Sequence, residues 1–344
     1  ALPIAAGKKI ALIGPFADAR LDLLGSWYGQ GQADKVVSIL TGLKERFGAD
    51  KVIYAKGSEP DKDDRNGFAA ALNAARSADK VVMAVGHPGF WSGEATSLTS
   101  IRIPAIQQEL IREVAQSGKP LILVLLNGRP LDLSWESTVA DAIVEAWYPG
   151  TEGGHAVADV LSGDFNPCGK LTMTFPRNLG QVPIHYDAKN TGRPYTPGQG
   201  EQHYVSRYLN EPTITPLYPF GYGLSYTTFG YSDLKVAPEK TDMKQPVAVT
   251  VTVKNTGKVR GTEVVQLYVR DLVASVTRPT RQLKGFERVT LEPGESREVC
   301  FTITSDAVGF YRQDMSFGYE PGDFKVWAGG SSDAALEGSF EITK

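Results

Sequence analysis

The sequence predicts an α/β domain with a mostly parallel sheet over residues 1–228, followed by an all-β sandwich over residues 229–344. Two observations carry this prediction. Short, nearly continuous apolar runs alternate with helical patterns as far as about residue 161, which is typical of parallel strands joined by helical crossovers. After residue 229 the hydrophobic period becomes two, as in half-buried strands.

The first domain contains apolar runs that have the length of buried strands. Strands that are apolar at consecutive positions are covered on both faces. We therefore expect helices on both sides of the sheet and a three-layer α/β/α sandwich. The predicted strands are Lys9–Ile13, Lys51–Ala55, Lys80–Val85, Pro120–Leu126 and Ala142–Trp147.

Helical periodicity fills the intervals between these strands. After Pro104, which suits a first helical turn, the apolar side chains of Ile106, Leu110 and Val114 fall on one face. The predicted helices are Val36–Phe47, Phe68–Ser77, Pro104–Gln116 and a helix from about Gly153 to Gly163.

Residues 166–229 are rich in Pro, Gly, Tyr and Asn and show no periodicity, so we interpret them mainly as a long connector. Short β-branched and aromatic segments separated by turn signals follow, which is typical of a sandwich of the immunoglobulin or fibronectin type III kind. The predicted strands are Val247–Lys254, Thr262–Arg270, Glu287–Leu291, Arg297–Thr304 and Phe324–Ala328.

Composition and charge argue against several classes of partner. The chain has 36 basic and 39 acidic side chains, a formal charge of −3, and no cluster of basic and aromatic residues, so we expect no nucleic acid partner. The apolar runs are far shorter than the roughly 20 residues that cross a bilayer, so we expect no membrane span. The first residues show neither the basic nor the apolar region of a signal peptide.

The sequence also lacks the motifs of common cofactor and hydrolase sites. The first strand–helix junction, Gly14–Asp18, contains neither glycine-rich phosphate fingerprint, and no G-x-S-x-G elbow occurs. The four histidines are scattered, and Cys168 and Cys300 are too far apart in sequence for a zinc or disulfide framework. We therefore expect no cofactor and no metal.

The best candidate site is the loop that follows the third predicted strand. In open α/β sheets, ligands bind at the carboxyl ends of strands. This loop, residues 87–98, holds Glu94 between Gly93 and Ala95, close to Trp91. On this logic alone a loop glutamate is more often a solvated surface acid than a catalytic group.

A set of ordered motifs makes the sequence similar to glycoside hydrolase family three, and in particular to the periplasmic β-glucosidases of Gram-negative bacteria. The resemblance spans nearly the whole chain. The motifs are Lys8–Pro15, Ser92–Ala95, Leu126–Pro130, Gly150–Gly154, Asn166–Leu171 and Leu217–Tyr226.

The resemblance implies a retaining β-glucosidase that hydrolyses terminal β-D-glucosyl residues. In that family a barrel carries an aspartate nucleophile, an α/β sandwich domain lends the acid/base glutamate, and a fibronectin-like domain follows. Glu94 matches the acid/base position, and the barrel is expected to precede residue 1, because its Ser-Asp-Trp type motif does not occur in the chain. We expect the chain to be inactive without that barrel.

The resemblance also implies a setting and a set of partners. The partners are a β-glucoside or oligosaccharide, the barrel of the same enzyme and a second copy in a homodimer, in the periplasm or outside the cell. Glu94 is expected to hold its proton through partial burial against Trp91 and the barrel. The segment Thr96–Ser100 lacks the arginine and aspartate that family members often carry there.

Two questions stay open at this level. Trp91 is the candidate for substrate binding by stacking on a sugar at the aglycone side, but a tryptophan that braces its own loop explains the sequence equally well. The alternative function is a non-catalytic carbohydrate-binding or assembly module that uses the same loop.

Overall fold

The computed structural model describes residues 1–195 and 203–343, and the chain divides into two compact units. The first unit comprises Ala1–Phe165 together with Pro176–Val182. The second comprises Asn166–Phe175 and the chain from Pro183 onward. Much of the predicted connector therefore folds with the second unit, and the domain boundary at residue 228 stays a prediction.

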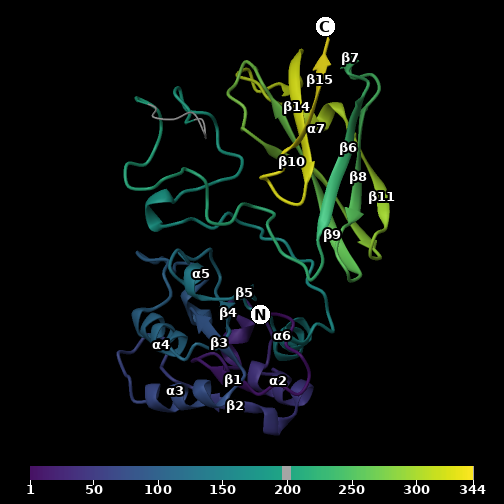
Figure 1. Cartoon of the computed structure of the whole chain (residues 1–344). Coiled ribbons are helices and arrows are strands. Elements are labelled where there is room, and N and C mark those ends of the chain that lie inside the picture. Colours follow the sequence, from purple (N-terminus) through teal and green to yellow (C-terminus); the bar gives the residue numbers. More distant parts are fainter. Residues whose placement is uncertain (196–202, 344) are drawn as a thin grey trace. The chain divides into compact units, whose positions relative to one another are not determined.

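The first unit is built on a five-stranded sheet in the order β2-β1-β3-β4-β5. Every neighbouring pair in this sheet is parallel, as predicted (Figure 1). The strands are β1 (Ile10–Ile13), β2 (Val52–Ala55), β3 (Lys80–Gly86), β4 (Leu121–Leu126) and β5 (Ala142–Glu145).

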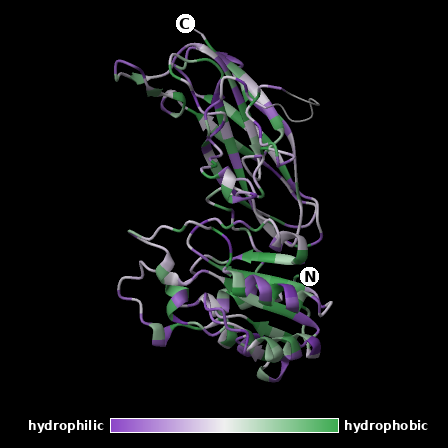
Figure 2. Ribbon diagram, turned by 90° about the vertical axis from the view of Figure 1, so that its left-hand side faces the viewer, coloured by the Kyte–Doolittle hydropathy of each residue, from purple (hydrophilic) through white to green (hydrophobic). Residues whose placement is uncertain are grey.

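Helices cover both faces of this sheet, which confirms the three-layer prediction. Because side chains alternate between faces along a strand, Leu12 packs with α2 and α6, whereas Ile13 faces the layer of α3 and α4. The central strands are strongly hydrophobic, as the colouring in Figure 2 shows. The long helices are α2 (Ile39–Phe47), α3 (Phe68–Ser77), α4 (Ala105–Ala115) and α6 (Gly153–Ser162); short helices are α1 (Leu21–Leu24), α5 (Glu136–Val139), η1 (Ala33–Lys35), η2 (Ala49–Lys51), η3 (Gly89–Trp91) and η4 (Leu179–Gln181).

Two glycines allow α2 and α6 to touch backbone to backbone. A Cβ atom on Gly42 would lie 2.2 Å from the carbonyl oxygen of Gly154, and one on Gly154 would lie 2.1 Å from the carbonyl oxygen of Ser38. The Gly154 N–H also donates to the carbonyl of Val37. Only glycine fits at these two positions without moving a helix.

The second unit contains a β-sandwich, as predicted. Its two main sheets have the strand orders β10-β9-β14-β15-β7 and β11-β8-β6, and a core of alternating apolar side chains lies between them. The strands are β6 (Phe229–Ala237), β7 (Lys240–Thr241), β8 (Val247–Asn255), β9 (Gly261–Asp271), β10 (Gln282–Leu291), β11 (Ser296–Ile303), β12 (Phe310–Tyr311), β13 (Phe317–Gly318), β14 (Gly322–Gly329) and β15 (Leu336–Ile342), with one short helix, α7 (Ser305–Val308).

The aromatic motif near residue 220 attaches the connector to the sandwich. Phe220 stacks on Tyr186 at 4.2 Å between ring centroids, and the amide of Gln266 on β9 donates to the carbonyl of Gly221. Nearby, Lys170 and Glu263 form an ion pair with little exposed surface. Within the described ranges, no helix is long and apolar enough to span a bilayer.

The helix contact predicts that Gly154→Ala destabilises the first unit. The added methyl group meets backbone atoms rather than a movable side chain, so we expect a loss of about 2–3 kcal/mol in the free energy of unfolding, within the range for overpacking. Urea unfolding of the full chain measures this. Gly169→Ala is the control, because a Cβ atom there meets no atom within 4 Å; equal stability of the two variants would contradict the prediction.

Candidate active site

Glu94 lies on the loop that leaves the carboxyl end of β3. The loop begins at Gly86, makes the 3-10 turn η3 (Gly89–Trp91) and carries Glu94 with its side chain exposed. Among the described residues Glu94 has no salt-bridge partner. The carboxylate is therefore neither neutralised nor buried within its own unit, and it is free to act on a ligand.

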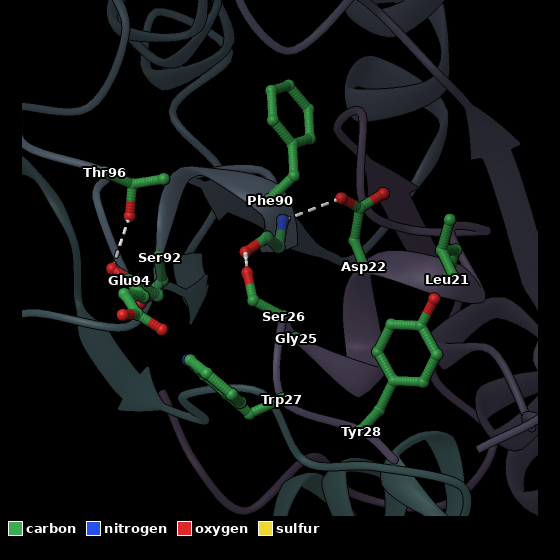
Figure 3. A pocket seen from close by; sticks show the side chains of 12 residues that line it. Leu21, Asp22, Gly25, Ser26, Trp27, Tyr28, Phe90, Ser92, Glu94 and Thr96 are labelled. Carbon is green, nitrogen blue, oxygen red and sulfur yellow. Dashed lines mark hydrogen bonds between the residues drawn. The ribbon is translucent and has the colours of Figure 1, made fainter. Parts of the chain in front are cut away.

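Glu94 lines a pocket of about 440 Å³. The other wall comes from the segment at and after α1, which follows the first strand of the sheet. In Figure 3, Trp27 of this segment lies next to Glu94, whereas Leu21 and Tyr28 lie farther from it. Trp27 and Phe90, which line this pocket, are 76% and 70% exposed, so both rings are accessible to a ligand.

Hydrogen bonds join the two walls of this pocket. The Gly89 N–H donates to Oδ1 of Asp22 at 2.9 Å, and the hydroxyl of Ser26 donates to the Gly89 carbonyl (Figure 3). Gly93 has a φ of 132°, and a Cβ atom there would lie 3.1 Å from Nε1 of Trp27. The loop before Glu94 is thus fitted closely against the Trp27 segment.

Arg129, on the loop after β4, fixes the backbone on both sides of Glu94. Its Nη2 donates to the carbonyl oxygens of Trp91 at 2.7 Å and Thr96 at 3.3 Å. The hydroxyl of Thr96 in turn donates to the Gly93 carbonyl at 2.7 Å. Arg129 is thus a cationic anchor for the Glu94 loop, whose segment Thr96–Ser100 carries no charged side chain of its own.

Trp91 does not line the pocket. Its ring packs against His87, with centroids 5.2 Å apart, and its edge meets Phe90 at 6.4 Å. His87 is buried, which lowers the pKa of its imidazole, and its Nε2 bonds to the Arg102 carbonyl at 2.8 Å. This geometry fits a tryptophan that braces its own loop. Sugar binding by Trp91 stays a prediction.

Sequence reasoning missed Trp27. It follows the first predicted strand, so it lies at the same edge of the sheet as Glu94. Two adjacent aromatic residues, Trp27-Tyr28, in a glycine-containing loop at a strand end could have indicated a ligand contact. The absence of a phosphate motif drew attention away from this loop. The described residues contain no group of His, Cys, Asp or Glu side chains arranged to hold a metal ion.

A second carboxyl group, Glu145, lies at the carboxyl end of β5. Oε1 accepts from the Trp147 N–H at 3.0 Å, and Oε2 accepts from Nδ2 of Asn127 at 3.2 Å. Although the residue keeps some exposed surface, burial is the largest influence on its carboxyl group and raises the pKa to about 8 against these two hydrogen bonds. Glu145 was read as part of a strand, because a single residue in an apolar run gives no sign of such an environment.

Comparison with known proteins identifies the family of the chain. The Glycosyl hydrolase family 3 C-terminal domain matches residues 1–226, and a fibronectin type III-like domain matches residues 263–332. The chain belongs to glycoside hydrolase family 3. The family resemblance seen in the motifs is therefore confirmed.

Relatives within family 3 are similar over nearly all of this chain. A periplasmic β-glucosidase of Salmonella typhimurium is 45% identical over 99% of the chain and 47% of its own length, and a β-xylosidase of Formosa agariphila is 42% identical over 95% of the chain and 45% of its own length. A structure of Listeria innocua β-glucosidase with glucose matches with a TM-score of 0.94 and 40% identity, over 100% of the chain and 47% of that protein. The chain spans about half the length of these family 3 proteins.

The raised pKa of Glu145 predicts how stability of this family 3 chain varies with pH. The native carboxyl group keeps its proton up to about pH 8, whereas the unfolded one loses it near its ordinary pKa of 4.5. Between these values the native state binds more protons than the unfolded state, so this contribution to stability is present at low pH and is lost as pH rises. The loss is at most about 1.4 kcal/mol per pH unit.

Glu145→Gln should abolish that contribution. We expect the free energy of unfolding of the unsubstituted chain, measured relative to Glu145→Gln, to fall between pH 5 and pH 8. Glu113→Gln is the control, since Glu113 is exposed on α4. Parallel pH curves for the unsubstituted chain and Glu145→Gln would show that burial does not govern this carboxyl group.

Proposed function

We propose that this chain is the part of a retaining β-glucosidase that supplies the general acid/base, and that Glu94 is that group. The observation that carries the proposal is the exposed, unpaired carboxylate of Glu94 in a pocket wall, on a loop held at both flanks by Arg129. Membership of family 3 supports it, as do relatives named β-glucosidases.

The chemistry requires a second carboxylate. A retaining glycosidase protonates the leaving oxygen with one carboxylic acid while a nucleophilic carboxylate, about 5–5.5 Å away, attacks the anomeric carbon. The same acid then serves as base toward water in the second displacement. We propose that the nucleophile lies on the barrel of the complete enzyme, and that the barrel and the bound sugar cover Glu94, since nothing in its own unit does.

Trp27 is our proposed contact for the leaving-group sugar. Its ring is exposed beside Glu94, and an aromatic face can pack against the C–H face of a sugar while the hydroxyl groups stay in water. The protonated oxygen joins the two sugars, so the leaving group must lie close to Glu94. A Listeria innocua β-glucosidase structure that contains laminaribiose supports a β-glucosyl disaccharide as a ligand of this class.

The setting follows from the relatives. We propose terminal β-D-glucosyl residues as the substrate, and the periplasm or the extracellular space as the location, by analogy with the Salmonella typhimurium enzyme. Since one relative is a β-xylosidase, glucosides and xylosides should be assayed side by side. Association into a homodimer stays a prediction.

Replacement of Glu94 should make the rate depend on the leaving group. In the chain complemented with its barrel, we expect Glu94→Gln to lose about 10²–10⁴-fold in kcat/KM for a disaccharide, whose leaving oxygen needs a proton. A dinitrophenyl β-glucoside, whose leaving group departs without one, should lose far less in glycosylation. Steady-state and burst kinetics with both substrates measure this.

The matched control is Glu113→Gln, an exposed carboxylate on α4 that should leave both rates unchanged. Equal losses of Glu94→Gln on both substrates would contradict acid catalysis. Sugar binding by the chain with no turnover after complementation would support the alternative, a carbohydrate-binding or assembly module.

Trp27→Ala should weaken binding of the leaving-group sugar. We expect KM for a β-glucosyl disaccharide to rise about tenfold, the effect of losing one stacking contact of about 1.4 kcal/mol, with a small effect on an activated aryl glucoside. Trp91→Phe is the comparison, because it keeps an aromatic ring beside His87. A rise in KM with Trp91→Phe and none with Trp27→Ala would transfer the sugar contact to Trp91.

A further inference from the structure

We propose that Glu145 is a positioning residue for the acid/base loop: it holds Asn127, and through Asn127 it sets the Arg129 segment that fixes the backbone on both sides of Glu94. The structural part of this inference concerns the loop alone. Its consequence for catalysis rests on the proposed function of Glu94.

The first link joins the ends of β5 and β4. Nδ2 of Asn127 donates to Oε2 of Glu145 at 3.2 Å and to the carbonyl oxygen of Arg129 at 2.9 Å. Asn127 is fully buried, so neither bond can be replaced by bulk water without opening the structure. The position of the Arg129 backbone therefore depends on which way the Asn127 amide points.

The second link joins the Arg129 segment to the acid/base loop. The guanidinium of Arg129 donates to the carbonyls of Trp91 and Thr96, which flank Glu94. The backbone itself also touches the loop, since a Cβ atom on Gly128 would lie 2.0 Å from the hydroxyl oxygen of Ser92. A shift of the 127–129 segment is thus transmitted to Glu94 by two routes.

An unpaired acceptor gives this link two states. Oδ1 of Asn127 is buried and has no hydrogen-bond partner among the described residues. Ionised Glu145 accepts hydrogen bonds and suits the observed amide orientation. Protonated Glu145 is itself a donor, and rotation of the amide would present Oδ1 to it while withdrawing Nδ2 from the Arg129 carbonyl. The only proton exchanged is that between Glu145 and solvent.

The other titratable and charged groups at this end of the sheet do not reproduce such a change near pH 8. Tyr148, which donates to the Pro88 carbonyl at 3.0 Å, has a pKa raised to about 12, mainly by burial. His87 has a lowered pKa, again mainly by burial, and is neutral in this range. Arg129 stays a cation. Of the carboxylates, Asp22 accepts from the Gly89 N–H, and Asp132 pairs with Arg102.

Amide hydrogen exchange of the loop in the full, uncomplemented chain tests the proposal. With exchange corrected for the intrinsic effect of pH, residues 89–98 should become about fivefold more protected as pH rises from 6 to 9, the change expected for one hydrogen bond. Glu145→Gln, which carries no charge, should keep the low-pH level throughout. Arg129→Met should lose protection at every pH, and Glu113→Gln should behave as the unsubstituted chain.

The proposal is overturned if the exchange protection of residues 89–98 does not change with pH in the unsubstituted chain. This test does not depend on whether any variant folds. The proposal also fails if Glu145→Gln keeps the full pH response. Neither result depends on catalysis, whereas failure of the acid/base role would appear in the leaving-group dependence of Glu94→Gln. In the complemented enzyme, Glu145→Gln should lower kcat several-fold above about pH 8, where Glu145 is ionised, with little change in KM, and so alter the alkaline limb of the pH profile.

Discussion

The proposed acid/base role of Glu94 depends on the hydrogen bonds that one guanidinium makes to two backbone carbonyls. A glutamate on a long loop cannot deliver a proton reproducibly unless its main chain is held, because a small displacement of the donor costs much of the rate. Arg129 holds the carbonyls of Trp91 and Thr96, and Glu94 projects from the short stretch between them. The side chain keeps its exposure, while the backbone beneath it is fixed.

The parallel sheet makes this arrangement possible. The loops after β1, β3 and β4 all leave the carboxyl ends of the strands, so Trp27 and Glu94 line one pocket, and Arg129 binds the backbone of the Glu94 loop. β5 adds Glu145 at the same edge. The contact of Gly42 with Gly154 joins α2 to α6, the two helices that pack on one face of this sheet.

The periodic elements could be predicted because their patterns are local. The helix expected over Phe68–Ser77 has those bounds in the structure, and the predicted parallel strands differ by at most two residues at either end. β6 was missed, since a bulge between Ser232 and Lys235 breaks its alternation and places Asp233 at a φ of 53°. β15 was missed as well, because Gly338 and Ser339 interrupt its apolar residues.

The candidate site could be predicted only in part. The position of Glu94 follows from its motif and from the rule for strand ends, but the pocket partners depend on tertiary neighbours that no local pattern encodes. Trp27 was overlooked because its loop lacks a phosphate motif, and Glu145 because the environment of one carboxyl group is decided by Asn127, Trp147 and the surrounding protein. The roles of charged and aromatic residues at strand ends can be assigned only when the fold shows which residues lie next to them.

The most direct measurement is a crystal structure of the complete enzyme, barrel included, with a bound inhibitor. We predict that the Glu94 carboxyl group faces the glycosidic oxygen and lies about 5–5.5 Å from the nucleophilic carboxylate of the barrel. A structure in which Glu94 points away from the sugar, or in which another carboxyl group occupies that position, would contradict it.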